Sequence, residues 1–387
     1  MNAALHPVSR IHTGPADARP LRLGVLTPHN PHDRRAFSGT VFHATRALSR
    51  RRGLELRLIG PHRHAGRVDR LLRRGSFRFE PHMLAPDGSD FDGLDTVIGL
   101  VASSLLDEAA MLTDLPMIHV TDATPGFLGE AYGRKVPAGV PDREARVLAR
   151  STGVYSSRVM AELARAEFGA VAADARALPF GVNFSDPPRD PPRKPALDRL
   201  ELLFVGADWE RKGGDLVLEA FGRLRSGGRA AHLTLVGGVP AEVKAALRGR
   251  DDITLAGFLD KNRPRHLERL RALFARGHIL VLPTRADCTP MVVAEALAHG
   301  TPVLATDVGA IGEMMGPGSG RVLPPAATGA EWADALEQMT GDPAAYAMMS
   351  DAATERAATR LNWDSWAVGI AGLAAEVAGT GAARVAA

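Results

Sequence analysis

The sequence predicts an α/β protein with two doubly wound, Rossmann-like domains that face each other across a cleft. Short apolar runs alternate with helical patterns in both halves of the 387 residues, as in βαβ units that build a parallel sheet. A proline-rich stretch, residues 183–198, interrupts this alternation, and proline disfavours regular structure there. A chain of this length also favours two domains over one.

The N-terminal domain is expected over residues 21–182. Residues 1–20 contain no continuous apolar segment of the kind a signal peptide needs, so we expect a flexible tail. Four apolar runs predict strands, at 21–28, 54–61, 91–104 and 115–125. Helical patterns follow at three places, directly after 37–40 and at about 142–151 and 156–169.

The C-terminal domain is expected over residues 199–360, after the 183–198 linker. Its predicted strands are 200–207, 231–238, 253–259, 278–284 and 301–307. Helical patterns separate several of these runs and continue around Trp332 and Tyr346. Residues 361–387 are alanine-rich and apolar, and we expect a helix there that packs back toward the N-terminal domain.

Composition restricts the class of protein. The formal net charge is +3 and there is one cysteine, Cys288, so neither an internal disulfide framework nor a cysteine-rich zinc cluster is available. No apolar run is long enough to cross a bilayer. We therefore expect a cytoplasmic protein. The arginine-rich stretch 62–78 is either a solvated basic helix or a peripheral contact with an anionic membrane.

The segment "RADCTPMVVAEALAHG", residues 285–300, predicts the start of a helix that can bind phosphate. Thr289 is a suitable N-cap and Pro290 a suitable first helical residue. The helix would run to about His299. The free amides of Met291 and Val292 would then point out of its positive end, where anions bind.

Two acids flank this helix start, Asp287 before it and Glu295 within it. Alone, this spacing fits solvated acids beside a capped helix. However, the strand at 278–284 runs directly into the loop, and ligands bind at the carboxyl ends of parallel strands. The acids are therefore candidates to contact opposite ends of one ligand. Cys288 is not a candidate nucleophile, because no accompanying histidine and amide or acid indicate a thiol triad.

A second segment, "FVGADWERKGGDLVLEAF", places two adjacent cations between a strand and a helix. Gly213 and Gly214 let the backbone approach a ligand, and Arg211 and Lys212 can neutralise a diphosphate. The alternative is a solvated basic loop. Neither a Walker loop nor a dinucleotide-binding glycine pattern occurs at the first strand–helix turns, which argues against kinases and dehydrogenases.

These two segments, followed by "TPVLATDVGAIGE", closely resemble the family-four glycosyltransferases of the GT-B fold. The Glu-x7-Glu motif of that family corresponds here to Asp287-x7-Glu295. The resemblance implies that Asp287 contacts the donor sugar and Glu295 the ribose of the nucleotide. It also implies a nucleotide-sugar donor and retention of anomeric configuration.

The resemblance assigns further donor-binding residues in the C-terminal domain. Lys212 corresponds to the diphosphate-binding lysine of the family. The usual Gly-Arg pair after the strand is Gly206-Ala207 here, so Arg211 is the expected substitute for the missing arginine. "GFLDK" resembles the loop that contacts the nucleobase, which implies that Phe258 and Leu259 lie near the base.

In the N-terminal domain the resemblance implies that Gly39 and Thr40 of "FSGT" approach the diphosphate. The segment "IHVTDAT" corresponds to the place where the family has a histidine or an acid near the reacting sugar, so His119 and Asp122 are catalytic candidates. His119 also fits a buried core histidine, and Asp122 is better located, at the end of the strand. "LPFGVNF", residues 178–184, resembles the crossover between the domains.

The sequence therefore predicts a retaining glycosyltransferase of the hexosyltransferase type. Its mechanism would be mainly electrostatic and metal-independent, with catalytic roles for Arg211, Lys212 and Asp287. Scattered histidines form no metal-ligand cluster, so we expect no cofactor. The predicted partners are a nucleotide sugar and an acceptor of unassigned class, and no nucleic acid. Two alternatives are a catalytically impaired nucleotide-sugar-binding protein and a sugar-nucleotide epimerase.

Overall fold

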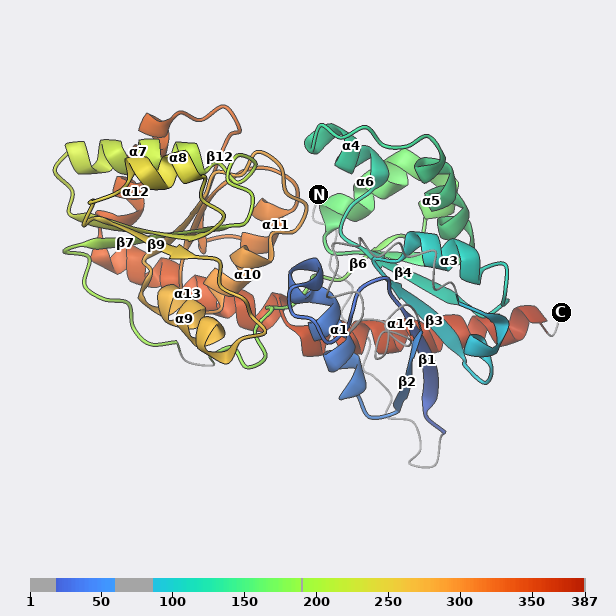
Figure 1. Ribbon diagram of the computed structural model, residues 1–387. Helices are drawn as coiled ribbons and strands as arrows, with labels where there is room; N and C mark the ends of the chain where they lie inside the picture. Colours follow the sequence, from blue (N-terminus) through green and yellow to red (C-terminus); the bar gives the residue numbers. More distant parts are fainter. Residues whose placement is uncertain (1–18, 60–85, 189–190, 386–387) are drawn as a thin grey trace, which may run out of the picture.

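The computed structural model describes residues 19–59, 86–188 and 191–385, which form two α/β domains side by side (Figure 1). The predicted tail falls almost entirely outside these residues, and so does the basic stretch 62–78. The cytoplasmic location and the peripheral membrane contact stay predictions from the sequence. Within the described part of the chain, no helix combines the length and apolar character that crossing a membrane requires.

The described strands of the N-terminal domain form one parallel sheet in the order β2-β1-β3-β4-β5-β6. The strands are β1 (Leu21–Leu26), β2 (Leu54–Ile59), β3 (Thr96–Leu100), β4 (Met117–Thr121), β5 (Ser151–Tyr155) and β6 (Arg176–Ala177). The helices are α1 (Thr40–Ser49), α3 (Ser103–Ala109), α4 (Pro125–Ala131), α5 (Gly139–Arg150) and α6 (Arg158–Phe168). The helix predicted at 142–151 thus begins three residues earlier and stops where β5 starts.

The described strands of the C-terminal domain form a second parallel sheet in the order β12-β11-β10-β7-β8-β9. The strands are β7 (Leu200–Gly206), β8 (Ala231–Gly237), β9 (Ile253–Gly257), β10 (Ile279–Leu282), β11 (Val303–Thr306) and β12 (Gly320–Leu323). The helices are α7 (Gly214–Ser226), α8 (Ala241–Ala246), α9 (Pro264–Arg276), α10 (Met291–Leu297), α11 (Ile311–Met315), α12 (Gly329–Thr340) and α13 (Pro343–Arg360). The predicted fold class, two doubly wound Rossmann-like domains, is confirmed.

Helices cover both faces of each sheet, which explains why the buried strands read as continuous apolar runs. In the N-terminal domain α1 packs on one face, while α3 and α5 pack on the other. A single apolar cluster continues from this domain into the C-terminal domain. The two domains therefore share part of their core.

The last helix, α14 (Trp363–Val385), follows α13 and lies along the N-terminal domain (Figure 1). Ile370 of α14 joins the same apolar cluster as Leu48 of α1. At the surface, Arg176 of β6 donates to Glu376 at 2.6 Å. The chain thus crosses between the domains a second time and returns to the first.

Candidate functional site

A cavity of about 430 Å³ lies between the two domains, at the carboxyl ends of their strands. The N-terminal domain contributes Arg34, Arg35, Phe37, Ser38, Thr40, Asp122, Tyr132 and Phe180 to its lining. The C-terminal lining includes Gly206, Ala207, Arg211, Lys212, Phe258, Leu259, Lys261, Asp287, Thr289, Pro290, Met291, Val292 and Glu295. Most of the predicted site residues therefore meet in one pocket, and two of them, Gly39 and His119, do not line it.

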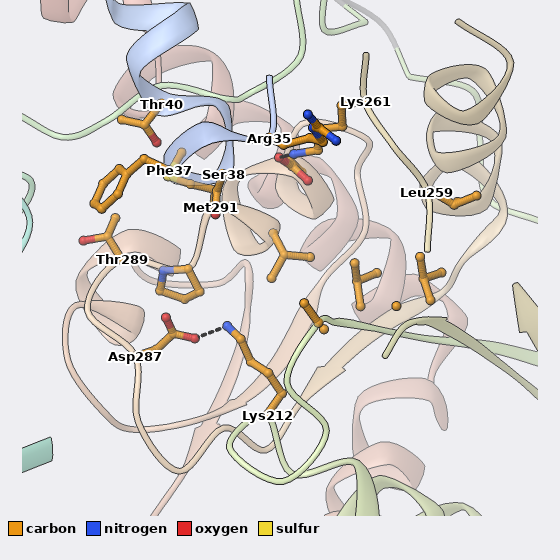
Figure 2. Close-up of a pocket in the computed structure, with 18 of the residues that line it drawn as sticks. Arg35, Phe37, Ser38, Thr40, Lys212, Leu259, Lys261, Asp287, Thr289 and Met291 are labelled. Carbon is orange, nitrogen blue, oxygen red and sulfur yellow. Dashed lines mark hydrogen bonds and ion pairs between the residues drawn. The ribbon is translucent and has the colours of Figure 1, made fainter. Parts of the chain in front are cut away.

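Lys212 and Asp287 form an ion pair in this pocket (Figure 2). The loop before α7 supplies the lysine, and the loop after β10 supplies the acid. Asp287 is buried, and Nη1 of Arg211 lies 3.8 Å from its Oδ2 atom. The acid expected to contact a sugar and the cations expected to contact a diphosphate are thus neighbours.

Two glycines allow the loops that carry this pair to pack closely. Gly213 has φ +74°, and a Cβ atom there would lie 2.0 Å from the carbonyl oxygen of Pro283. Gly309 has φ +57°, and a Cβ atom would lie 2.0 Å from the carbonyl oxygen of Asp287. A side chain at either position would combine backbone strain with a steric clash.

The start of α10 differs from the prediction. The helix begins at Met291, and Pro290 is the N-cap residue rather than the first helical residue. Thr289 does not cap the helix, because its hydroxyl lies 2.6 Å from the hydroxyl of Ser156 in the N-terminal domain. The first intrahelical bond runs from Val293 N to Pro290 O at 2.9 Å. Helix α10 also ends at Leu297, two residues before the expected end.

Glu295 is deeply buried, with a relative exposure of 2%, and it forms an ion pair with Lys261. Burial raises the pKa of Glu295, and the charge and hydrogen bond of Lys261 oppose this rise. Lys261 belongs to the "GFLDK" loop, in which Phe258 is largely exposed and Leu259 is buried. Lys261 was not predicted as a site residue, although it follows Phe258 and Leu259 in that loop.

Asp122 lies directly after β4 and lines the pocket from the N-terminal side. Burial raises its pKa to about 7, and the nearby Asp287 carboxylate adds to the rise. The protonated form of this carboxyl group is therefore populated at neutral pH. A group with such a pKa can accept or donate a proton in this range.

The structure corrects the catalytic assignment of His119. This residue is 1% exposed within β4, and its Nε2 atom lies 2.7 Å from Oε1 of Glu144. Ser103 donates to the same carboxylate. His119 is thus part of a buried polar cluster with Glu144 of α5 and Ser103 of α3, and it does not line the pocket.

The "FSGT" segment forms a tight turn before α1. Phe37, Ser38 and Gly39 all have positive φ, of 47°, 58° and 94°. Gly39 is needed for this turn but does not line the pocket, whereas Ser38 and Thr40 do. The side chain of Asn183, in the crossover segment, donates to Ser38 O at 3.0 Å and to Thr40 Oγ1 at 3.2 Å. The crossover therefore holds the turn against the cleft.

Several pocket residues were not predicted, chiefly Arg34, Arg35, Tyr132 and Lys261. Arg35 forms an ion pair with Asp33 at 3.0 Å, so its charge is locally compensated. Among the residues with a described placement, no group of three or more His, Cys, Asp and Glu side chains could hold a metal ion.

Two facing Rossmann-like domains with a pocket between them define the GT-B architecture. Residues 199–342 match the family described as "Glycosyl transferases group 1". Over 93% of its length the chain is similar to sucrose-phosphate synthase from Thermosynechococcus elongatus, with a TM-score of 0.67, 17% identity and 99% of that chain covered. Anabaena HepE, solved in complex with UDP, gives a TM-score of 0.65 at 14% identity, covering 92% of this chain and 100% of that one.

Two curated relatives are similar in sequence. An α-D-kanosaminyltransferase of Streptomyces kanamyceticus is 29% identical over 46% of this chain and 46% of its own length. A D-inositol 3-phosphate glycosyltransferase of Xylanimonas cellulosilytica is 26% identical over 66% of this chain and 65% of its own length. The chain thus covers less than two thirds of either relative. The C-terminal domain thus matches the group 1 glycosyltransferase family, and the solved structures share the two-domain fold of the chain, which supports the resemblance found in the sequence.

Proposed function

We propose that this protein transfers a sugar from a nucleoside-diphosphate donor to an acceptor hydroxyl, with retention of anomeric configuration. One observation carries the proposal. Arg211 and Lys212 meet Asp287 in a pocket that Asp122 closes from the opposite domain. A cationic pair beside two acids suits a ligand that carries a diphosphate at one end of its sugar and hydroxyl groups around the rest.

In this proposal, catalysis is mainly electrostatic. The bond between the anomeric carbon and the diphosphate oxygen breaks, and Lys212 and Arg211 stabilise the negative charge that develops on the leaving group. Asp287 binds sugar hydroxyls, Glu295 binds the ribose, and Phe258 and Leu259 lie beside the base. The acceptor hydroxyl bonds to the anomeric carbon from the side of Asp122. The two cations supply the charge stabilisation, so the proposed transfer needs no metal ion.

The donor class is tested first by thermal shift with a panel of nucleoside diphosphates and their sugars. A ligand that binds only the folded protein stabilises it by about 2.7 kcal/mol at a concentration of about 100 times its Kd. UDP and UDP-glucose belong in the panel because structural neighbours were solved with UDP and with UDP-glucose. A panel without any shift would contradict the proposal.

Transfer is then tested with the Lys212→Ala and Glu295→Ala variants. Both should lose nearly all turnover while remaining folded, because each removes a group that faces the donor. Lys244→Ala is the matched control, since this lysine is exposed on α8 of the same domain and lies outside the pocket. Unchanged turnover in both pocket variants would refute the assignment.

A second candidate function is nucleotide-sugar binding without transfer. The loss of the usual arginine at Ala207 and the shorter acid at Asp287 both lie at the reacting end of the pocket. Such a protein would show the thermal shift but release no nucleotide from its sugar. An epimerase would instead convert the donor without an acceptor, and product analysis with donor alone distinguishes it.

A further inference from the structure

Tyr132 of the N-terminal domain reaches the cation pair of the C-terminal domain. It is the residue after α4, and its side chain lines the pocket. Its hydroxyl lies 3.4 Å from the sulfur of Cys288, which is 156 positions away in the sequence. The guanidinium carbon of Arg211 lies 5.4 Å from the centre of the tyrosine ring. Tyr132 therefore contacts both catalytic loops of the opposite domain.

The remaining partners described for Arg211 belong to its own domain. Its Nε atom donates to Oδ2 of Asp208 at 3.1 Å, and Nη1 donates to the carbonyl oxygen of Ala286 at 2.8 Å. Both bonds are made within the C-terminal domain, so neither depends on where the N-terminal domain lies. The tyrosine ring alone among these partners comes from across the cleft, and it attracts the cation through its face.

Other hydrogen bonds join the two domains across the cleft. The amides of Arg158 and Val159, at the start of α6, donate to the carboxylate of Glu313 at 2.9 and 3.1 Å. At the other end of the pocket, Arg34 N donates to Oδ1 of Asn262 at 3.0 Å. An opening of the cleft would break such contacts and would carry Tyr132 away from Arg211.

We propose that Tyr132 is a positioning residue that places the Arg211 guanidinium against the donor diphosphate when the two domains close. The inference rests on the proposed function. In this proposal, closure of the cleft brings the Tyr132 ring to Arg211. The guanidinium therefore reaches its position beside the leaving group only when closure has also excluded water.

The aromatic ring, rather than the hydroxyl, carries this role. Burial raises the pKa of the Cys288 thiol and of the Tyr132 hydroxyl, so both groups are neutral and their contact is a weak hydrogen bond. Phenylalanine keeps the ring and loses only that bond. The conservative variant therefore separates the two contributions.

The test is a double-mutant cycle with inorganic pyrophosphate, the group that all nucleoside-diphosphate donors share. Titration calorimetry would give the Kd of pyrophosphate for the wild type, Tyr132→Ala, Arg211→Ala and the double variant. We expect Tyr132→Ala to weaken binding about five- to tenfold, as a partly desolvated cation–π contact implies. The double variant should bind no more weakly than Arg211→Ala alone, because Tyr132 acts through that arginine.

Two controls complete the experiment. Tyr132→Phe should restore binding to within about twofold of the wild type, since it keeps the cation–π contact. Arg134→Ala removes a second guanidinium, 5.5 Å from the same ring but outside the pocket lining, and should leave the Kd unchanged. Melting temperatures confirm that each variant is folded.

The results separate the failure of the Tyr132 role from the failure of the proposed function. Additive losses in the double variant, or no loss in Tyr132→Ala, would overturn the role of Tyr132 while leaving the proposed function intact. If the wild type does not bind pyrophosphate and Lys212→Ala keeps the turnover of the wild type, the proposed function and this inference both fail.

Discussion

The raised pKa of Asp122 makes a quantitative prediction about stability. Its carboxyl group has a pKa of about 7 in the folded protein and an ordinary value of 3.8. Between these pH values the folded protein holds a proton that the unfolded chain has lost, so the free energy of unfolding falls as pH rises. The difference corresponds to about 4 kcal/mol, at about 1.4 kcal/mol per pKa unit. This is an upper limit, because the carboxylate is partly accessible to water in the pocket.

Asp122→Asn should therefore stabilise the protein at high pH and leave it nearly unchanged at low pH. Urea unfolding at pH 4 and pH 8 measures this directly, with equal m-values for the two proteins as the check on two-state behaviour. We expect a gain of about 2–4 kcal/mol at pH 8 and below about 1 kcal/mol at pH 4. The same variant should transfer sugar more slowly, since stability gained at an active site commonly reduces activity.

The result that refutes this reasoning is a difference between variant and wild type that does not depend on pH. Such a result would mean that the carboxylate is well solvated in the folded protein. Asp114→Asn is the matched control. Asp114 is 95% exposed at its side chain, and its one ion pair among the described residues is with Arg150 at the surface, so its removal should change the free energy of unfolding little at any pH.

Two further predictions concern the pocket walls. Lys261→Met leaves Glu295 buried without its cation. The free energy of unfolding at pH 7, measured by urea titration, should therefore fall by about 3 kcal/mol. Adding Glu295→Gln to this variant should recover most of the loss. Gly309→Ala should displace the Asp287 carbonyl and abolish transfer. Gly228 is the matched control, because it also has a positive φ but has open space around it. Gly228→Ala should therefore lower the free energy of unfolding by only about 1 kcal/mol and keep its activity.

The fold was predictable because its information is local. Strands buried on both faces are near-continuous apolar runs, and such runs appear in the sequence where β1, β7, β8 and β10 form. Strand β5 was missed because its sequence, "STGVY", follows helix α5 without any turn residue and contains a glycine. The helical pattern of α5 continues up to Arg150, so the sequence does not mark where β5 begins.

The site was predictable only where both members of a contact lie in recognisable motifs. Lys212 and Asp287 were each assigned from a motif that follows a strand, and the carboxyl ends of parallel strands lie at one edge of the sheet. Tyr132 was not expected, because only tertiary structure brings it to Arg211. Thr289 shows the opposite failure. Threonine is a favoured N-cap residue, but the Thr289 hydroxyl contacts the hydroxyl of Ser156 in the N-terminal domain instead of a backbone amide of α10.

The two lysine–acid pairs have a consequence for how a donor would bind. Lys212 and Asp287 are both largely buried, so the pocket compensates its own charges before any ligand arrives. A diphosphate would offer Lys212 a stronger partner than one carboxylate, and it would release Asp287 for the sugar hydroxyls. Lys212 would thus exchange one anionic partner for another, so its buried charge would stay paired throughout. An unpaired buried charge would destabilise the complex. In the proposed function, one ion pair thus couples diphosphate binding to recognition of the sugar.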